Sequence, residues 1–231
     1  MGQNVAWGNL DYVLRGMAAT VRLSLVAAFL AVTLGVFAGI ARMYAPRLLR
    51  PFVVAYIEVF RGTPVLVQMF FMFFGLPLVL GLNMSAFNAA ALALVMNSGA
   101  YFAEITRGGI QSIPQGQLMA GLSQGLTVTQ VLRYIVIPQA IRRIIPPAVG
   151  QFTILVKDTS VASVIGFFEM TRAGQHIVER TLAPFEIFTL VAVLYFAVCY
   201  TGSWASRRLE VRLAYTGPAG TMRREYVLGA G

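Results

Sequence analysis

The chain has 231 residues, of which 58% are hydrophobic and only 12% are charged, and its formal net charge is +9. A soluble domain carries about twice that share of charged residues, so the composition excludes an ordinary soluble protein. The segments 23–41, 62–103 and 187–206 contain no Asp, Glu, Lys, Arg or His. Apolar stretches of about 20 residues match a hydrocarbon core of about 30 Å, so we predict an all-α, polytopic membrane protein.

The positive charge does not indicate a nucleic-acid partner, because the arginines lie between the apolar segments and form no stripe interleaved with aromatic residues. Arginines in such places set membrane topology and contact anionic lipid in the bilayer. A single cysteine, Cys199, excludes a disulfide framework, and one histidine, His176, cannot form a metal site alone. We expect no metal site on this chain, and we expect His176 to be a solvated loop residue.

Five spans are predicted, at about 18–41, 51–80, 87–110, 139–158 and 186–206. The first lacks a basic region before it and a small-residue cleavage pattern after it, so we expect it to be retained. Arginines cluster in three connectors, at Arg42, Arg47 and Arg50, at Arg133, Arg142 and Arg143, and at Arg207, Arg208 and Arg212. The positive-inside rule makes their common side cytoplasmic. The N-terminus is then outside, and 207–231 is a cytoplasmic tail.

The first span carries small residues at every fourth position: Ala27, Ala31, Gly35 and Gly39. Small residues at this spacing let the backbones of membrane helices approach closely, so this strip predicts a packing face.

The second span is interrupted by polar residues and a glycine. Glu58 and Arg61 are one helical turn apart and can pair. Gly62 breaks the helix, and we expect Thr63 to cap the next helix and Pro64 to occupy its first position. A break inside the membrane is tolerated where it lines a cavity or is covered by protein.

Near the inner end of the third span, Glu104 and Arg107 repeat the same spacing. Two interpretations remain open for these charged residues of spans two and three. They are gate or packing contacts, or they contact a ligand directly.

The segment 111–137 is rich in Gln, Ser, Thr and Gly and is too polar to span a membrane. We predict one or two short helices on the cytoplasmic face, broken near Gly125 and offered to a partner. An inert connector is the alternative.

The fourth span ends in Lys157-Asp158-Thr159-Ser160, and Lys157 is the only lysine of the chain. Fourteen helical residues after Arg143 advance about 21 Å, which places the charges inside the core. A charge there costs about 2.5–3.5 kcal/mol, so such residues pair or line an aqueous path. A path for a zwitterion and a structural ion pair are both open.

These residues resemble the polar amino acid permeases of bacterial ATP-binding-cassette (ABC) importers. The similarity runs from about residue 14 to 208, and its order and spacing make it specific. The matching stretches are Arg61-Gly62-Thr63-Pro64 with Gln68, Glu104-Ile105-Thr106-Arg107-Gly108-Gly109-Ile110 with Ser112, Gly116-Gln117, Gly125-Leu126, Pro138-Gln139-Ala140, Pro146-Pro147, and Lys157-Asp158-Thr159-Ser160 with Ile165-Gly166.

The resemblance implies a permease like those of type I ABC importers, in the bacterial inner membrane, dimerising with itself or with a sister permease. It also implies two copies of a cytoplasmic ATPase, which would bind the ATP, and a periplasmic or extracellular solute-binding protein. We therefore expect an importer of polar amino acids with no cofactor on this chain. The candidate path residues are Glu58, Arg61, Thr63, Glu104, Lys157, Asp158, Thr159 and Ser160.

In the family, the loop after span three carries a Glu-Ala-Ala motif and a glycine and docks into the ATPase. This chain has Met119-Ala120-Gly121 in the motif and keeps Gly125. The missing glutamate implies a different docking contact or a sister subunit with the fuller motif, and we favour the heteromeric permease. The candidate coupling residues are Gly116, Gln117, Met119, Ala120, Gly121, Gly125 and Leu126.

An enzyme is disfavoured because the sequence lacks Gly-x-Ser-x-Gly, His-Glu-x-x-His and a phosphate-binding Gly-x-x-x-x-Gly-Lys-Ser/Thr loop. A passive channel or a membrane-anchor subunit of another complex is the remaining alternative. The broken span and the intramembrane charges would fit a channel, but a channel gives no role to the segment 111–137.

Overall fold

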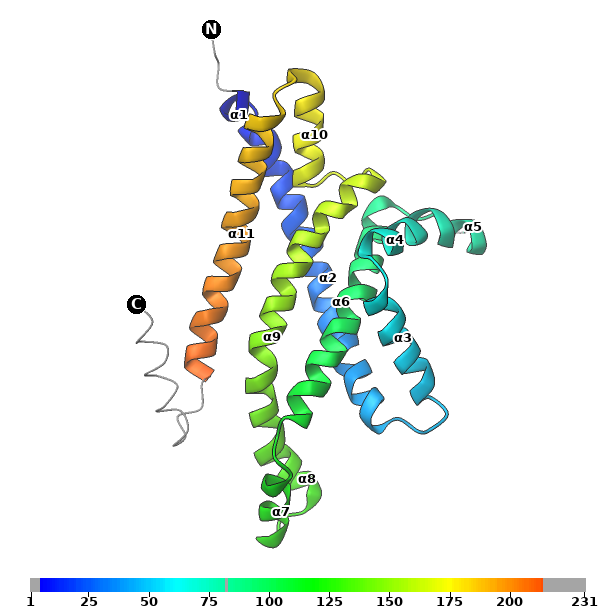
Figure 1. The fold of residues 1–231 in the computed structure, drawn as a ribbon, viewed down its shortest axis with the longest axis vertical. Helices are drawn as coiled ribbons and strands as arrows, with labels where there is room; N and C mark the ends of the chain where they lie inside the picture. Colours follow the sequence, from blue (N-terminus) through cyan, green and yellow to red (C-terminus); the bar gives the residue numbers. More distant parts are fainter. Residues whose placement is uncertain (1–4, 82, 214–231) are drawn as a thin grey trace.

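The computed structural model describes residues 5–81 and 83–213, and this part of the chain is helical, with no β-strand. Figure 1 shows an elongated bundle. Its elements in chain order are α1 (Val5–Gly8), α2 (Leu10–Tyr44), α3 (Arg50–Gly62), α4 (Val65–Phe70), the π-helix η1 (Phe71–Gly75), α5 (Leu76–Leu80), α6 (Ala86–Gln111), α7 (Gln115–Ser123), α8 (Val128–Val131), the π-helix η2 (Leu132–Val136), α9 (Ile137–Asp158), the 3-10 helix η3 (Thr159–Ile165), α10 (Met170–Thr181) and α11 (Pro184–Leu213).

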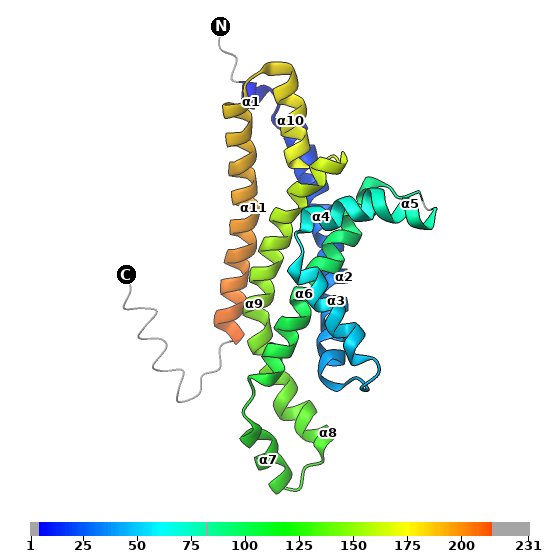
Figure 2. The same cartoon turned by 45° about the vertical axis from the view of Figure 1, so that its right-hand side comes forward.

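Within residues 5–81 and 83–213, four helical segments are long and apolar enough to cross a membrane: Leu10–Tyr44, Ala86–Gln111, Val128–Ile165 and Pro184–Trp204. The predicted second span, 51–80, is not one straight helix. It consists of Arg50–Gly62 and Val65–Leu80, and the chain bends by 109° between them. The five predicted spans therefore agree with the structure if this bent pair counts as one span. Figures 1 and 2 show α4 and α5 turning away from the bundle axis.

The later elements are longer than the sequence predicted. The fourth predicted span, 139–158, is the middle of a helical rod that begins at Val128 and continues through η3. The predicted cytoplasmic segment 111–137 therefore contains one separate helix, α7, followed by the start of this rod. The fifth predicted span, 186–206, lies within α11, and residues 214–231 of the predicted tail lie outside the described residues.

The predicted small-residue face of the first span is confirmed, because α2 packs along α6 through it. A Cβ atom built on Gly35 would lie 2.3 Å from the Cβ of Phe102, and one built on Gly39 would lie 2.5 Å from the carbonyl oxygen of Ala103. Ala27 is fully buried in the same strip. The two backbones are thus too close for a side chain at either glycine.

The end of the bundle opposite α7 is closed by α10, which the sequence did not predict. The buried carboxylate of Glu169 caps this helix, accepting hydrogen bonds from the backbone N–H of Thr171 and of Arg172. The hydroxyl of Tyr195, on α11, donates to the same carboxylate at 2.7 Å. Burial raises the pKa of the Glu169 carboxyl, and these hydrogen bonds oppose that rise.

His176 lies on α10, so its expected place in a solvated loop is wrong. Its Nδ1 atom is 3.0 Å from the hydroxyl of Tyr12 on α2, and the ring is half-buried. The backbone N–H of Met170 also donates to the Thr20 hydroxyl of α2. These contacts join α10 to α2, and Figure 2 shows both helices at the end of the bundle near the N-terminus.

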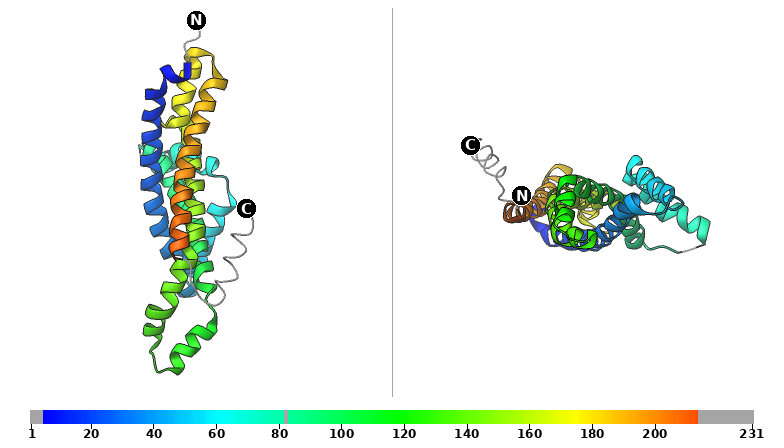
Figure 3. Two further views of the ribbon diagram at one scale, coloured as in Figure 1. Left: turned by 90° about the vertical axis from the view of Figure 1, so that its left-hand side faces the viewer. Right: turned by 90° about the horizontal axis from the view of Figure 1, so that it is seen from below.

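Figure 3 shows how the peripheral elements are placed. Viewed from below, α3, α4 and α5 lie on one side of the bundle and α11 lies on the opposite side. Viewed from the side, α7 and α8 project beyond the bundle at the end opposite α10. The broken span and the projecting helices are therefore the two departures from a simple bundle, and both carry candidate functional residues.

Candidate functional site

The break between α3 and α4 is held by side-chain amides. The carbonyl oxygen of Phe60 accepts hydrogen bonds from Nε2 of Gln68 and from Nδ2 of Asn97, each at 2.9 Å. Gln68 Nε2 also donates to the carbonyl oxygen of Thr63 at 3.1 Å. A broken helix leaves carbonyl groups without helical partners, and unpaired carbonyls are costly inside a membrane. Gln68 and Asn97 therefore satisfy carbonyl groups that the break leaves without helical partners.

Two expectations about the break are wrong in detail. Thr63 does not cap α4, because its hydroxyl donates to the carbonyl oxygen of Val59 in the preceding helix at 2.8 Å. Pro64 stands at the N-cap position of α4, one residue before its first helical position. The extended backbone that a residue before proline prefers accounts for the position of the turn, since Thr63 has φ −118° and ψ 146°.

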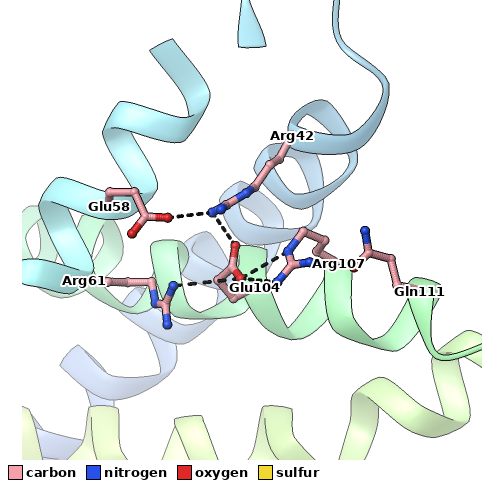
Figure 4. A network of polar contacts seen from close by, with 6 residues as sticks. All are labelled: Arg42, Glu58, Arg61, Glu104, Arg107 and Gln111. Atoms are coloured by element: carbon pink, nitrogen blue, oxygen red, sulfur yellow. Dashed lines mark hydrogen bonds and ion pairs between the residues drawn. The ribbon is translucent and has the colours of Figure 1, made fainter. Parts of the chain in front are cut away.

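Glu104 is the centre of a charge network that joins α2, α3 and α6 (Figure 4). Its carboxylate lies 2.5 Å from Arg42, 2.7 Å from Arg107 and 3.9 Å from Arg61. Glu58 extends the network, 3.1 Å from Arg42. The Glu104 side chain is 16% exposed, whereas that of Glu58 is 56% exposed. The network thus has a shielded centre and an open edge.

Of the pairs one helical turn apart, Glu104–Arg107 is confirmed and Glu58–Arg61 is not formed. Glu58 instead forms an ion pair with Arg42 of α2, and the guanidinium of Arg61 lies 3.9 Å from the carboxylate of Glu104. The structure therefore brings Glu58, Arg61 and Glu104 together in one charge network between helices. Thr63 follows Arg61 by two residues and lies at the break.

The candidates Lys157 to Ser160 lie at the other end of the rod, where α9 passes into η3. Lys157 is exposed and Asp158 half-exposed, and within the described chain neither takes part in an ion pair. Thr159 is fully buried, and its hydroxyl donates to the carbonyl oxygen of Val156 at 2.7 Å. Ser160 is half-exposed. The structural Lys–Asp pair is absent from the described residues, where Lys157 is exposed and Asp158 is only partly exposed.

The candidate coupling residues lie on α7 and the turn after it. α7 ends in a Schellman motif: Gly125, at φ +82°, donates to the carbonyl oxygen of Leu122, and Leu126 donates to that of Gly121. Thr127 and Gln130 then form a capping box that starts α8. Gly116, Gln117, Met119, Ala120 and Gly125 are exposed, and Leu126 is half-buried. The turn is therefore tightly defined, and most of the segment is open to a partner.

Gly121 is buried against the rod that follows it. A Cβ atom built on this residue would lie 2.7 Å from Cγ2 of Val131 and 3.2 Å from Cδ1 of Ile135. An alanine at this position, as in the motif of the resembled family, would require the stiff Val131 side chain to move. Met119, in the place of the family glutamate, is 64% exposed, so its side chain is not confined by packing as position 121 is.

Sequence reasoning missed the role of Asn97 and Glu169, and it noted Gln68 only as a motif residue. A polar amide within the uncharged stretch 62–103 was the available signal for the two amides. Two buried atoms near the break, Nε of Arg61 and Oε1 of Gln68, have no hydrogen-bond partner among the described residues. The same residues contain no group of three or more His, Cys, Asp or Glu side chains that could hold a metal ion.

Residues 31–215 match the model of a protein family described as the inner membrane component of binding-protein-dependent transport systems. The glutamine transport system permease protein GlnP of Escherichia coli strain K12 is 38% identical over 208 residues, which cover 90% of this chain and 95% of that protein. The probable glutamine ABC transporter permease protein GlnP of Bacillus subtilis strain 168 is 39% identical over 207 residues, covering 88% and 94%.

Two solved structures share the fold. A crystal structure of an amino acid ABC transporter with histidines superposes with a TM-score of 0.83 at 36% identity, covering 88% of this chain and 94% of that one. An inward-facing structure of the MetNI methionine ABC transporter gives a TM-score of 0.76 at 20% identity, covering 93% of this chain and 100% of that one. The second likeness concerns the fold alone.

Proposed function

The chain belongs to the family of inner membrane components of binding-protein-dependent transport systems, and we propose that it is the permease subunit of an ATP-driven importer of polar amino acids. The observation that carries this proposal is a likeness in sequence and in fold that extends over nearly the whole chain. The sequence is 38% identical to that of a glutamine permease, and the fold superposes on that of an amino acid transporter with a TM-score of 0.83. Glutamine heads the list of candidate substrates because two of the similar permeases are named for it.

The partners follow from this role. The permease pairs with itself or with a sister permease, two copies of a cytoplasmic ABC ATPase bind and hydrolyse the ATP, and an external solute-binding protein delivers the substrate. The chain itself then needs no cofactor. The experiment is uptake of labelled glutamine, arginine and glutamate into liposomes that contain the complete complex. We expect uptake only with binding protein and ATP, and uptake without ATP would favour the passive channel.

Lys157 and Asp158 are the strongest candidates for contact with the substrate, and Thr159 is the weakest because its hydroxyl is used within the fold. Unpaired charges at the end of a span are unfavourable toward lipid, so they face water or a second permease. A zwitterion needs opposite charges as it loses its hydration shell. We therefore place the translocation path at the junction of α9 and η3, where Lys157, Asp158 and Ser160 are at least partly exposed, completed by the partner permease.

Replacing Asp158 with Asn tests this path. We expect uptake to fall at least about tenfold, which corresponds to one lost charge-assisted contact of about 1.4 kcal/mol, with expression and assembly retained. Asp11→Asn is the matched control, since Asp11 is largely exposed and pairs with Arg15 on α2. A variant at 158 that fails to assemble would show a structural role instead, and normal transport would remove Asp158 from the path.

The proposed orientation places the chain in a bacterial inner membrane with the N-terminus outside and with α7 and the end of α11 in the cytoplasm. Its support is the three arginine clusters, two of which adjoin the α7 end of the bundle. We expect Arg212→Cys, in a Cys199→Ser background, to react with an impermeant thiol reagent only after the cells are opened. Labelling in intact cells, with a cytosolic control protein unlabelled, would invert the topology.

A further inference from the structure

A basic cavity lies beside the charge network, at the end of α2 and α6 that leads toward α7. Its volume is about 330 Å³, and it is lined by Arg42, Met43, Tyr44, Arg50, Arg107 and Gln111. Three of the six lining residues are arginines, and they come from three different helices, α2, α3 and α6. A cavity that gathers guanidinium groups from separate elements is suited to an anion.

The charges around this cavity do not balance within the described chain. Arg42, Arg61 and Arg107 share the carboxylates of Glu104 and Glu58, so three guanidinium groups face two carboxylates. Arg50 lines the same cavity and takes part in no ion pair among the described residues. The site therefore holds excess positive charge even after its own network is satisfied.

The surface next to the cavity is apolar as well as basic. The connector from α2 to α3 exposes Tyr44, Leu48 and Leu49, and Phe52 follows in the first turn of α3. Leu48 is 80% exposed and Phe52 is 72% exposed. Large apolar side chains beside arginines at a helix end suit the boundary between headgroups and acyl chains. A soluble anion would use the arginines but not these side chains.

We propose that this cavity binds the phosphate headgroup of an anionic phospholipid. The phosphate would be held by Arg42, Arg50 and Arg107. One guanidinium group can donate two parallel hydrogen bonds to the oxygens of one phosphate. Basic pockets between membrane helices are also known to bind anionic headgroups. The acyl chains would run along Leu48 and Phe52. Because Arg42 and Arg107 also hold Glu104, the bound lipid would fasten the junction of α2, α3 and α6.

The experiment measures lipid binding to the full chain, purified in detergent with the subunits that accompany it. Phosphatidylglycerol, phosphatidylcholine or inorganic phosphate is added at salt high enough to screen loose surface attraction. Retained lipid is measured by native mass spectrometry and the apparent melting temperature by thermal unfolding. We expect phosphatidylglycerol alone to be retained and to raise the melting temperature.

Two matched variants test the cavity itself. Arg50→Gln removes a guanidinium that lines the cavity and leaves the Glu104 network intact, so we expect phosphatidylglycerol binding to weaken about tenfold. Arg47→Gln removes the same charge from the same connector outside the lining, and we expect its binding to stay within about twofold of the parent chain. Equal losses in the two variants would show general surface attraction and overturn the proposal. Equal binding of both lipids, or an equal shift with inorganic phosphate, would overturn it too.

Discussion

Glu104 shows how one side chain can hold three helices. Its two oxygens accept hydrogen bonds from Arg42 of α2 and Arg107 of α6, and the guanidinium of Arg61 from α3 lies within 4 Å. Ion pairs exposed to solvent contribute about 0–1 kcal/mol, but removing one partner from a shielded network leaves the remaining charges without compensation. The shielded position of Glu104 therefore makes its charge more important than that of Glu58.

We expect Glu104→Gln to lower the free energy of unfolding by about 1–3 kcal/mol, because the amide keeps the size of the side chain but not the charge that faces the arginines. Glu58→Gln is the control, with an expected loss below about 1 kcal/mol because that side chain is more than half exposed. Apparent melting temperatures in one detergent and lipid mixture provide the measurement. Equal shifts for the two variants would mean that the network has no shielded centre.

One of these ion pairs could be predicted from the sequence and the other could not. The Glu104–Arg107 pair follows from helix spacing alone, since the two are one turn apart on α6. The contact of Glu58 with Arg42 joins residues 16 positions apart on different helices, and only the packing of α2 against α3 creates it. The amide of Gln68 was visible as a polar residue in an apolar stretch, but its partners depended on where the break fell.

Helix packing at the level of elements depends on the glycines of α2. Gly39→Ala would place a methyl group 2.5 Å from the backbone oxygen of Ala103, and backbone cannot move aside as a flexible side chain can. We expect α2 and α6 to separate and stability to fall by about 1–3 kcal/mol. Gly108→Ala, on α6, meets nothing within 4 Å and should gain up to about 1 kcal/mol from helix propensity.

Thermal unfolding of both variants beside the parent chain provides the test. A gain for Gly108→Ala validates the assay, because it shows that a methyl group is tolerated on a membrane helix where space allows. If Gly39→Ala were as stable as the parent, the close approach of α2 and α6 would be wrong.

Element prediction succeeded where one physical signal dominated and failed where two competed. The small-residue strip and the break near Gly62 followed from residue types. The short helix α10 was missed because its residues, such as Arg172, Glu179 and Arg180, resemble those of a solvated connector. Its stability comes from the Glu169 cap and from contacts with Tyr195 and Thr20, which are distant in sequence. The sequence did not predict that the helix containing the fourth span begins at Val128. A polar, uncharged sequence can belong either to a separate connector or to the extension of a membrane helix beyond the bilayer.

At the scale of the whole molecule, the candidate path and the candidate coupling segment lie at opposite ends of one helical rod. The rod begins with α8 directly after the Schellman turn, and it ends at η3 beyond Lys157 and Asp158. A displacement of α7 by a partner would therefore act on a continuous helical segment that reaches Lys157 and Asp158 directly. The short turn at Gly125 makes this link stiff, because both helix ends beside it are capped.

This arrangement predicts the effect of Gly125→Arg. Gly125 has φ +82°, a backbone conformation that costs most residues other than Gly and Asn about 1 kcal/mol. The space around the residue is open. The arginine would therefore strain the turn and place a long cation on the exposed face next to Met119. We expect the variant to reach the membrane and to pair with its sister permease. It should lose either copurification of the ATPase or the stimulation of ATP hydrolysis by loaded binding protein.

Gly125→Asn separates the two causes, because Asn tolerates the left-handed conformation and carries no charge. If the turn alone matters, the Asn variant should couple normally, whereas a docking surface that admits no side chain should impair both variants. Copurified ATPase and substrate-stimulated ATP turnover are measured for the parent and the two variants at equal permease content. Parent values of both quantities in Gly125→Arg would make α7 an inert connector, and the replacement of the family glutamate by Met119 would then have no consequence for coupling.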